Sequence, residues 1–221
     1  NLIQKKFIKI NLIQLKYKMI KILSPFGPKM AKLKFSSNLI KKINMEVDKI
    51  TFKKKLAKKY DYSNKLVGQV KQEIYLPKSF VNKNLSKIIA KNIKEFIKKS
   101  TGKNPKKVKI KNFWVVRQYS NDYNPIHFHD GHVSGVGYLK IPKLLNKNEK
   151  KIKTHGTIDF INGNKMFLNE SIFNHLPKVG DVLLFPNYLM HTAYPFTCKG
   201  ERRSFSFNAE IDSNIANVFS K

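Results

Sequence analysis

The spacing of apolar residues changes near residue 107, and this change constrains the fold more than any other feature of the chain. Beyond it, short runs rich in Val, Ile, Phe and Tyr are separated by Gly, Pro and Asn, a pattern typical of strands joined by turns. We expect strands over 108–119, 133–141, 154–161, 182–185 and 204–211, with a turn at 177–181. In the last of these strands, apolar and polar residues alternate, which predicts a half-exposed strand. Such a series indicates an antiparallel sandwich or barrel.

The front half of the chain carries helical spacing instead. Ser37 and Asn38 precede apolar residues that recur at helical intervals as far as Val47, so we expect an N-capped helix there. A polar, lysine-rich connection is expected over 53–68, and a short strand over 70–76. The N-terminal half of the chain is thus expected to be mainly helical and the C-terminal half to be rich in strands.

The clearest helix is predicted over 84–100. Five apolar residues fall on one of its faces and lysines lie opposite, which is the pattern of a helix packed on a core. Asn84 or Ser86 can act as its N-cap, and Thr101-Gly102 ends it. The expected fold class is therefore mainly β with flanking N-terminal helices (α+β).

Length and composition limit the classes of protein to consider. A chain of 221 residues with 41% hydrophobic residues can bury one good core. Cys198 is the only cysteine, which excludes an intramolecular disulfide and suits a reducing compartment, so we expect a cytoplasmic protein. No apolar run approaches the roughly 20 residues of a membrane span, and lysines interrupt every apolar stretch near the start, so we expect neither a membrane span nor an export signal.

Charge is concentrated in the front half. Residues 1–110 hold 30 Lys and 5 acidic residues, whereas residues 111–221 hold 14 basic and 9 acidic residues. This asymmetry permits contact with a nucleic acid or another polyanion. However, 41 of the 44 basic residues are lysine, and base-reading sites usually employ arginine. A solvated lysine surface is the simpler interpretation.

We divide the chain into three segments. Met19 opens a plausible true start, so residues 1–18 are expected to be a non-native or disordered extension. Residues 19–106 are expected to form a supporting region of helices and strand, and residues 107–221 the core that carries the chemistry, within a single domain overall.

Three histidines are candidates for a metal site. His127 and His129 lie two residues apart, so on extended backbone their imidazoles face the same side, and Pro125 favours that conformation for the residue before it. His191, from a remote strand, completes a set of three ligands. Imidazole suits Fe, Zn, Cu and Ni, so the residue type selects no metal. Taken alone, a His-x-His pair is more often a surface pair.

The remaining histidines and one acid have weaker claims. Asp130 and His132 lie close to the pair and are alternative ligands or supporting partners. His155 and His175 have no such context, and we interpret them as ordinary surface residues.

Arg202 and Ser204 form a second candidate site, for a carboxylate. They share one face of a predicted strand, and a guanidinium grips a carboxylate with two parallel hydrogen bonds that a neighbouring hydroxyl supplements. Only a short segment separates His191 from Arg202, which fits a turn that returns an antiparallel strand beside the metal. Alone, Arg202 is more often a surface ion pair.

The ordered motifs of the back half resemble a known family. They are His-x-His at 127–129, Ser-Gly-Val-x-Tyr-Leu at 134–139, Leu-Phe-Pro at 184–186, then His191 and Arg-x-Ser-x-x-Phe-Asn at 202–208. This order resembles the 2-oxoglutarate and Fe(II)-dependent oxygenases, most of all the small phage and marine bacterial members. The approach from Tyr119 through Tyr123 to His127 is similar to that of prolyl-hydroxylase-like members. The resemblance covers roughly residues 107–212.

The resemblance implies a fold, cofactors and roles. The fold is a double-stranded β-helix, or jelly roll, with Fe(II) held by His127, His129 and His191 and with 2-oxoglutarate as cosubstrate. Arg202, with Ser204 and Tyr119, would bind the distal carboxylate of that cosubstrate. The expected reaction is hydroxylation of an unidentified substrate, whether protein, nucleobase or small molecule, with release of succinate and CO2. If the gene is phage-borne, the location would be the host cytoplasm.

The chain departs from the family pattern in one ligand. Members usually present His-x-Asp or His-x-Glu, whereas residue 129 is histidine, so the site is a three-histidine variant, uses Asp130, or is degenerate. Two other interpretations stay open: a metal-binding jelly roll without turnover, and a lysine-rich nucleic-acid-binding protein whose histidines are incidental. A combination, in which the basic front half docks the enzyme on its substrate, is a further hypothesis.

Overall fold

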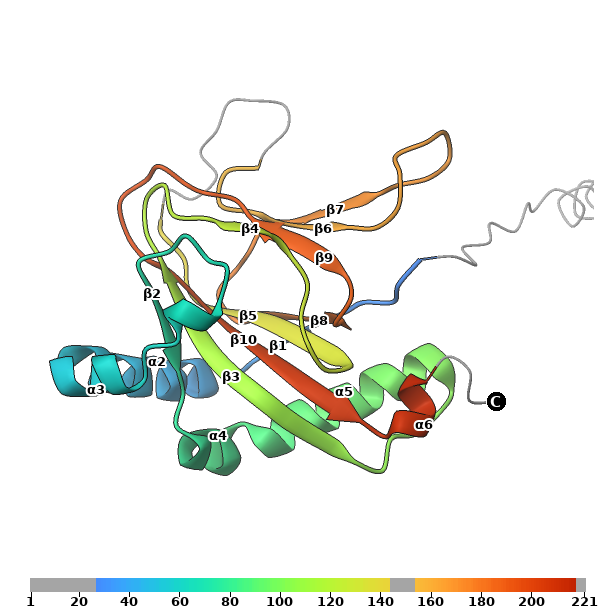
Figure 1. The fold of residues 1–221 in the computed structure, drawn as a ribbon, viewed down its shortest axis with the longest axis horizontal. Helices are drawn as coiled ribbons and strands as arrows, with labels where there is room; N and C mark the ends of the chain where they lie inside the picture. The colour runs from blue at the N-terminus through green and yellow to red at the C-terminus, as the bar shows by residue number, and fades with distance from the viewer. Residues whose placement is uncertain (1–26, 144–153, 218–221) are drawn as a thin grey trace, which may run out of the picture.

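Two antiparallel sheets face each other across the interior of the protein (Figure 1). The computed structural model describes residues 27–143 and 154–217. The six-stranded sheet has the order β1 (Ala31–Lys34), β8 (Asp181–Pro186), β5 (Val133–Lys140), β10 (Arg202–Ile211), β3 (Val108–Gln118) and β2 (Gln72–Tyr75). The four-stranded sheet has the order β4 (Asn124–His127), β9 (Met190–Ala193), β6 (Ile158–Ile161) and β7 (Ile172–His175). The expected mainly β class with N-terminal helices is confirmed.

Helices cover the outer face of the six-stranded sheet (Figure 1). They are α2 (Ser37–Phe52), α3 (Lys54–Lys59), α4 (Lys78–Asn84), α5 (Ser86–Thr101) and α6 (Ser213–Ala216). A 3₁₀ turn, η1 (Ser63–Lys65), lies beside β2. α2 contacts β5 and α5 contacts β3, so the two long helices lie on the central strands. In the described part of the chain, no helix has both the length and the apolar character that a membrane crossing requires.

The caps of the two long helices differ from expectation. Ser36, rather than Ser37 or Asn38, caps α2, and its hydroxyl accepts a hydrogen bond from the Leu39 N–H at 3.3 Å. No side chain caps α5, because Leu85 stands at its start and the preceding α4 runs directly into it. Gly102 ends α5 in the left-handed conformation at φ 74°, as the sequence predicts.

The central strand β10 explains why one burial prediction was wrong. Its apolar residues point to the helices and its polar residues point to the four-stranded sheet, as the alternation indicates, yet both faces are buried. Phe205 and Phe207 stack with Phe113 and Phe35 on the helix side. The polar face of this strand is therefore directed into the space between the sheets instead of into solvent.

Several local predictions need correction. The expected connection over 53–68 contains α3 and η1, and the expected strand over 154–161 is limited to β6. β1 and β2, which precede residue 107, are the two edges of the six-stranded sheet, so that sheet takes strands from both sides of the division expected there. Residues 1–18 lie outside the described residues.

Two glycines on β5 allow the aromatic rings of β10 to approach the sheet closely. A Cβ atom at Gly137 would lie well inside contact distance of the Phe205 ring, and one at Gly135 would overlap the Phe207 ring in the same way. Both rings are fully buried, so they have little freedom to move aside. The family-like Ser-Gly-Val-x-Tyr motif thus has a packing reason for its glycine.

We expect Gly137→Ala to lower the free energy of unfolding by roughly 1–3 kcal/mol, because overpacking a rigid core forces rings off their positions. Adding Phe205→Leu should recover part of that loss, so the double variant should be less destabilised than the sum of the single variants. Urea unfolding measures all three. Simple additivity of the two changes would contradict the proposed contact.

Candidate metal centre

Strand pairing brings two of the predicted histidines together. β4 and β9 are antiparallel neighbours, and His127 lies directly opposite His191 in their register. His129 follows the end of β4, where its N–H donates to the Asn187 carbonyl at 2.9 Å. One ligand nitrogen from each of the three imidazoles can be chosen so that all lie within 4.8 Å of one another. The structure thus gathers the three histidines that the sequence selected.

Backbone carbonyls fix how two of the rings present their nitrogens. His127 Nδ1 lies 2.7 Å from the Pro125 carbonyl, and His191 Nδ1 lies 2.9 Å from the Leu189 carbonyl. Because a carbonyl only accepts, both Nδ1 atoms carry the proton and both Nε2 atoms present a lone pair. This is the tautomer that a metal-binding histidine needs.

Burial keeps all three imidazoles neutral near pH 7. Burial lowers the pKa of His127 and, together with the neighbouring His127, lowers that of His129 to about 3. Burial and the other two rings lower the pKa of His191 well below its usual value. Neutral imidazole is the form that binds metals, so protons compete little for these nitrogens.

The spacing of the nitrogens suits a single ion. His129 Nε2 and His191 Nε2 are 3.0 Å apart. Two nitrogens bound at about 2.1 Å to one ion, at a right angle, would stand about 3 Å apart. Two lone pairs at this distance need either a shared proton or a shared cation, and the donor set fits the cation.

Aromatic side chains enclose the cluster. Phe185 lies 4.9 Å from the His191 ring, and Trp114 lies 5.5 Å from the His129 ring, measured between centroids. Phe160, which was not predicted, stacks on His191 at 5.5 Å. Phe205 and Phe207 point to the helices, so their role is core packing.

The alternative ligands lie elsewhere. Asp130 is exposed and forms a 2.6 Å ion pair with Lys111, and a side-chain oxygen of Asp130 accepts from the Gly131 N–H. His132 accepts a hydrogen bond from the Ile211 N–H. His175, which we interpreted as a surface residue, is buried and lies 3.4 Å from Asp181, so that interpretation was wrong.

Arg202 is buried beside the histidines. Its guanidinium donates to the Gly156 carbonyl at 2.6 Å and to the Gln118 side-chain oxygen, while its Nε is buried without a partner. A narrow cavity of about 30 Å³ between the sheets is lined by Arg202, Ser204, His127 and His191. The two candidate sites of the sequence thus open into one space.

Tyr119 does not reach this cavity. Its hydroxyl accepts a hydrogen bond from Arg117 at 2.6 Å. Successive residues at the C-terminal end of β3 face opposite sides of the sheet, and Gln118 is the one that points into the cavity. Tyr138 lines the cavity instead, and burial raises its pKa to about 12. The Ser-Gly-Val-x-Tyr-Leu motif contained this residue, so the period of two along β5 was the signal that identifies it.

A second hollow, of about 130 Å³, also adjoins the cluster. His127, His129 and Trp114 line it together with Gly68, Glu73 and Asn124. Glu73 is buried, and burial followed by the charge of Asp61 raises its pKa to about 7. The sequence analysis assigned Glu73 no role, because its place beside the histidines depends on the pairing of β2 with β3.

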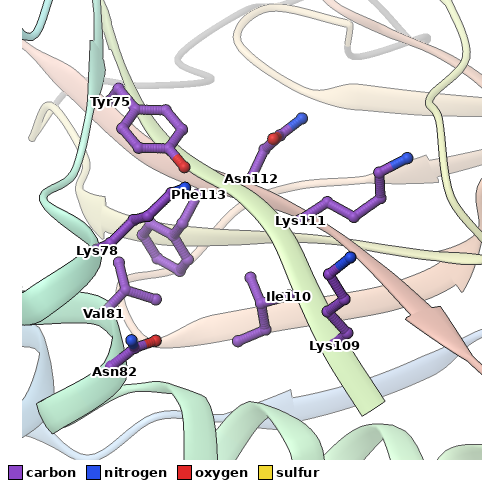
Figure 2. A pocket seen from close by; sticks show the side chains of 9 residues that line it. All are labelled: Tyr75, Lys78, Val81, Asn82, Lys109, Ile110, Lys111, Asn112 and Phe113. Carbon is purple, nitrogen blue, oxygen red and sulfur yellow. The ribbon is translucent and has the colours of Figure 1, made fainter. Parts of the chain in front are cut away.

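A larger hollow, of about 410 Å³, lies between α4 and β3 and contains none of these residues (Figure 2). Tyr75, Phe113 and three lysines line it. Lys109 and Lys111 both pair with Glu210, at 3.7 and 3.1 Å, so two of its cations are already balanced.

The family described as "Putative 2OG-Fe(II) oxygenase" matches residues 112–208, the segment that carries the histidines and Arg202. Over this segment the chain is similar to the 2OG-Fe(II) oxygenases. Its cofactor and cosubstrate are accordingly Fe(II) and 2-oxoglutarate. The predicted resemblance is confirmed, and the buried guanidinium and the three neutral imidazoles are groups that suit such an oxygenase.

Solved structures share the fold of this oxygenase. A Pseudomonas putida prolyl-4-hydroxylase matches at TM-score 0.56 and 10% identity, covering 84% of this chain and 92% of its own. A Trichoplax adhaerens prolyl hydroxylase with a hypoxia inducible factor peptide matches at 0.57 and 13%, covering 87% of each. A viral collagen prolyl hydroxylase from Paramecium Bursaria Chlorella virus-1 matches at 0.51 and 16%, covering 83% and 96%. No curated protein matches in sequence.

We expect the affinity of this oxygenase for Ni(II), as a redox-inert probe, to change less than about threefold between pH 8 and pH 6. Imidazoles of ordinary pKa would gain protons over that range, whereas the lowered pKa values move proton competition to more acidic solution. Calorimetric titration at the two pH values measures this, with His191→Ala as the control that loses tight binding. A tenfold loss at pH 6 would show that the rings titrate normally.

Proposed function

We propose that the protein is an Fe(II)- and 2-oxoglutarate-dependent dioxygenase that hydroxylates its substrate and releases succinate and CO2. One observation carries the proposal: two members of the cluster of three neutral imidazoles, His127 and His191, line the same cavity between the sheets as Arg202, a buried guanidinium with an unpartnered Nε. When bound, iron and 2-oxoglutarate supply the oxidative chemistry, and the chain supplies binding, orientation and exclusion of water.

In this proposal each residue of the cavity has a distinct task. His127, His129 and His191 hold the iron through Nε2, and the carbonyls of Pro125 and Leu189 keep two of those rings in place. Arg202 and Ser204 bind the distal carboxylate of 2-oxoglutarate, which supplies the acceptor that Arg202 Nε lacks. Tyr138 takes the supporting role first expected of Tyr119.

Burial of Arg202 strengthens this assignment. A guanidinium with 2% exposure has exchanged water for two neutral oxygens, and it has no carboxylate partner among the described residues. Unpaired buried charge is costly, so such a group is retained where an anion binds. Arg203, its neighbour, shows the contrast, because it pairs with Glu201 and Asp48 at 2.8 Å each and ties β10 to α2.

We expect Arg202→Gln to raise the 2-oxoglutarate concentration needed for half-maximal succinate release by roughly 10- to 100-fold, which corresponds to a charge-assisted hydrogen bond of about 1.5–3 kcal/mol. Ni(II) binding should be unchanged, because the imidazoles remain. Arg117→Gln is the matched control, since this guanidinium lies on the opposite face of β3.

The same assay separates the proposal from a metal-binding jelly roll without turnover. That alternative predicts tight Fe(II) binding but no succinate from 2-oxoglutarate and oxygen at any concentration. The anaerobic ferrous complex provides a second readout, because chelation of 2-oxoglutarate gives a weak visible absorption band. Wild-type protein that binds iron and shows neither band nor succinate would refute the dioxygenase proposal.

The lysine-rich front half supports a further part of the proposal, namely contact with a polyanion near the substrate. The helix α3 has the sequence KKLAKK, with none of its residues buried and no ion pair at its lysines within the described ranges. Unbalanced exposed lysines attract phosphate backbones and release counterions. The substrate itself stays open, whether protein, nucleobase or small molecule.

Replacing Lys54, Lys55, Lys58 and Lys59 by Gln should weaken binding of a single-stranded oligonucleotide and flatten its salt dependence. The log–log slope should fall by up to about 0.7 for each phosphate that a lysine no longer neutralises. Fluorescence anisotropy at several salt concentrations measures this. His127→Ala should leave the slope unchanged. Equal slopes for the wild type and the four-lysine variant would exclude α3 from polyanion binding.

A further inference from the structure

The hollow beside the histidines contains an acid without a counterpart. Glu73 is 1% exposed, and its Oε2 is buried with no hydrogen-bond partner. The chain has 44 basic and 14 acidic residues, so a lysine partner would be easy to supply, yet none of the described residues forms an ion pair with Glu73. A buried carboxyl group without a donor is unfavourable. A donor from outside the chain would complete it.

The surroundings of Glu73 offer acceptors and apolar surface. Asn124 Oδ1, also in this hollow, is buried without a partner. Gly68 lies against both groups, and a Cβ there would come within 2.9 Å of Glu73 Oε1 and closer still to Asn124. Trp114 forms an apolar wall, and the His127 and His129 rings close the side nearest the cluster. The exposed Lys65 also lines this hollow, with its ammonium group over the Tyr62 ring at 5.8 Å from the centroid, and it forms no ion pair with Glu73. The hollow thus offers unpartnered acceptors and borders the histidine cluster.

We propose that the recess formed by Gly68, Glu73, Trp114 and Asn124 binds the cationic nitrogen of an aliphatic amine or guanidine substrate, so that a neighbouring C–H faces the metal centre. This inference rests on the proposed dioxygenase function and names the substrate class of the same site. A charged donor is favoured over a neutral one because a desolvated ion pair with hydrogen bonds is stronger than a neutral contact. The volume of about 130 Å³ suits a short aliphatic chain.

The ionisation of Glu73 agrees with this geometry. Its pKa of about 7 leaves it partly protonated when alone, because burial and the Asp61 charge oppose ionisation. An incoming cation favours the carboxylate, so binding near pH 7 should release a fraction of a proton. Affinity for a cation should therefore rise between pH 6 and pH 8.

Trp114, the only tryptophan, lines the recess, so its fluorescence reports occupancy without any turnover. The probes are the Nα-acetyl N-methylamides of lysine, arginine and norleucine, titrated into metal-free protein and into protein loaded with Ni(II) and 2-oxoglutarate. Norleucine has the aliphatic chain of lysine without the ammonium group. We expect the lysine or the arginine probe to bind at least tenfold more tightly than the norleucine probe.

Glu73→Gln tests the carboxylate with almost no change of shape. The preference for the cationic probe should fall below twofold, whereas Glu95→Gln on α5, an exposed acid outside the recess, should retain it. Gly68→Ala should weaken all three probes, because its methyl group occupies the recess and displaces the side chains of Asn124 and Glu73. Equal binding of charged and neutral probes by the wild type, absence of binding by any probe, or an undiminished preference in Glu73→Gln would each overturn the proposal.

Folding of the Glu73→Gln variant can be checked separately. An acid whose pKa is raised from 4.5 to about 7 binds its proton more tightly in the folded state, so its contribution to stability falls as pH rises through that range. The glutamine variant lacks this loss and should gain stability relative to wild type from pH 5 to pH 8. The binding test also stands apart from catalysis. Charge-selective binding without succinate release would refute only the dioxygenase proposal. Succinate release without charge-selective binding would refute only the proposal that the recess binds a cation.

Discussion

Burial of both faces of β10 is the constraint on which the rest of the structure depends. Phe205 and Phe207 anchor one face to the helices through an aromatic stack that needs glycine on the neighbouring strand. With that face fixed, the period of two leaves Arg202 and Ser204 no direction except the space between the sheets. The four-stranded sheet then covers them and carries the histidines on its inner side. The packing of one face thus dictates the chemistry of the other.

The interior between the sheets is more polar than a core that served stability alone would be. It holds three imidazoles, a guanidinium with an unpartnered nitrogen and a carboxyl group with an unpartnered oxygen. The guanidinium and the carboxyl group each keep one buried atom without a partner, and each lowers stability unless a ligand completes it. Polar burial of this kind occurs where a site is prepared in advance for bound groups. Burial of the aromatic core beneath the helices offsets the unfavourable free energy of burying these polar groups.

The sequence predicted the parts of the fold and site that depend on local periodicity. Alternation on β10 and the His-x-His spacing correctly indicated which residues share a face, and the ordered motifs selected the histidines and Arg202. Predictions failed where a second layer decides the outcome. The alternation along β10 predicts an exposed polar face, and only the second sheet, with β4 and β9, covers it. Tyr119 was selected instead of Tyr138 because the sequence does not show where β3 ends. Glu73 was missed because β2 reaches the site through strand pairing alone.

The distribution of charge around the site gives the departure at residue 129 a physical meaning. A carboxylate ligand would cancel one positive charge of a ferrous ion, whereas three neutral imidazoles cancel none. Among the residues that line the two hollows beside the cluster, Glu73 is the only acid, and it lies in the wall instead of in the histidine cluster. The remaining positive charge of ion and Arg202 favours a dianionic cosubstrate on the Arg202 side. In the hollow that Glu73 lines, the exposed Lys65 is a second charged group, so the proposed preference for a cation there depends on the buried, unpartnered Oε2 of Glu73.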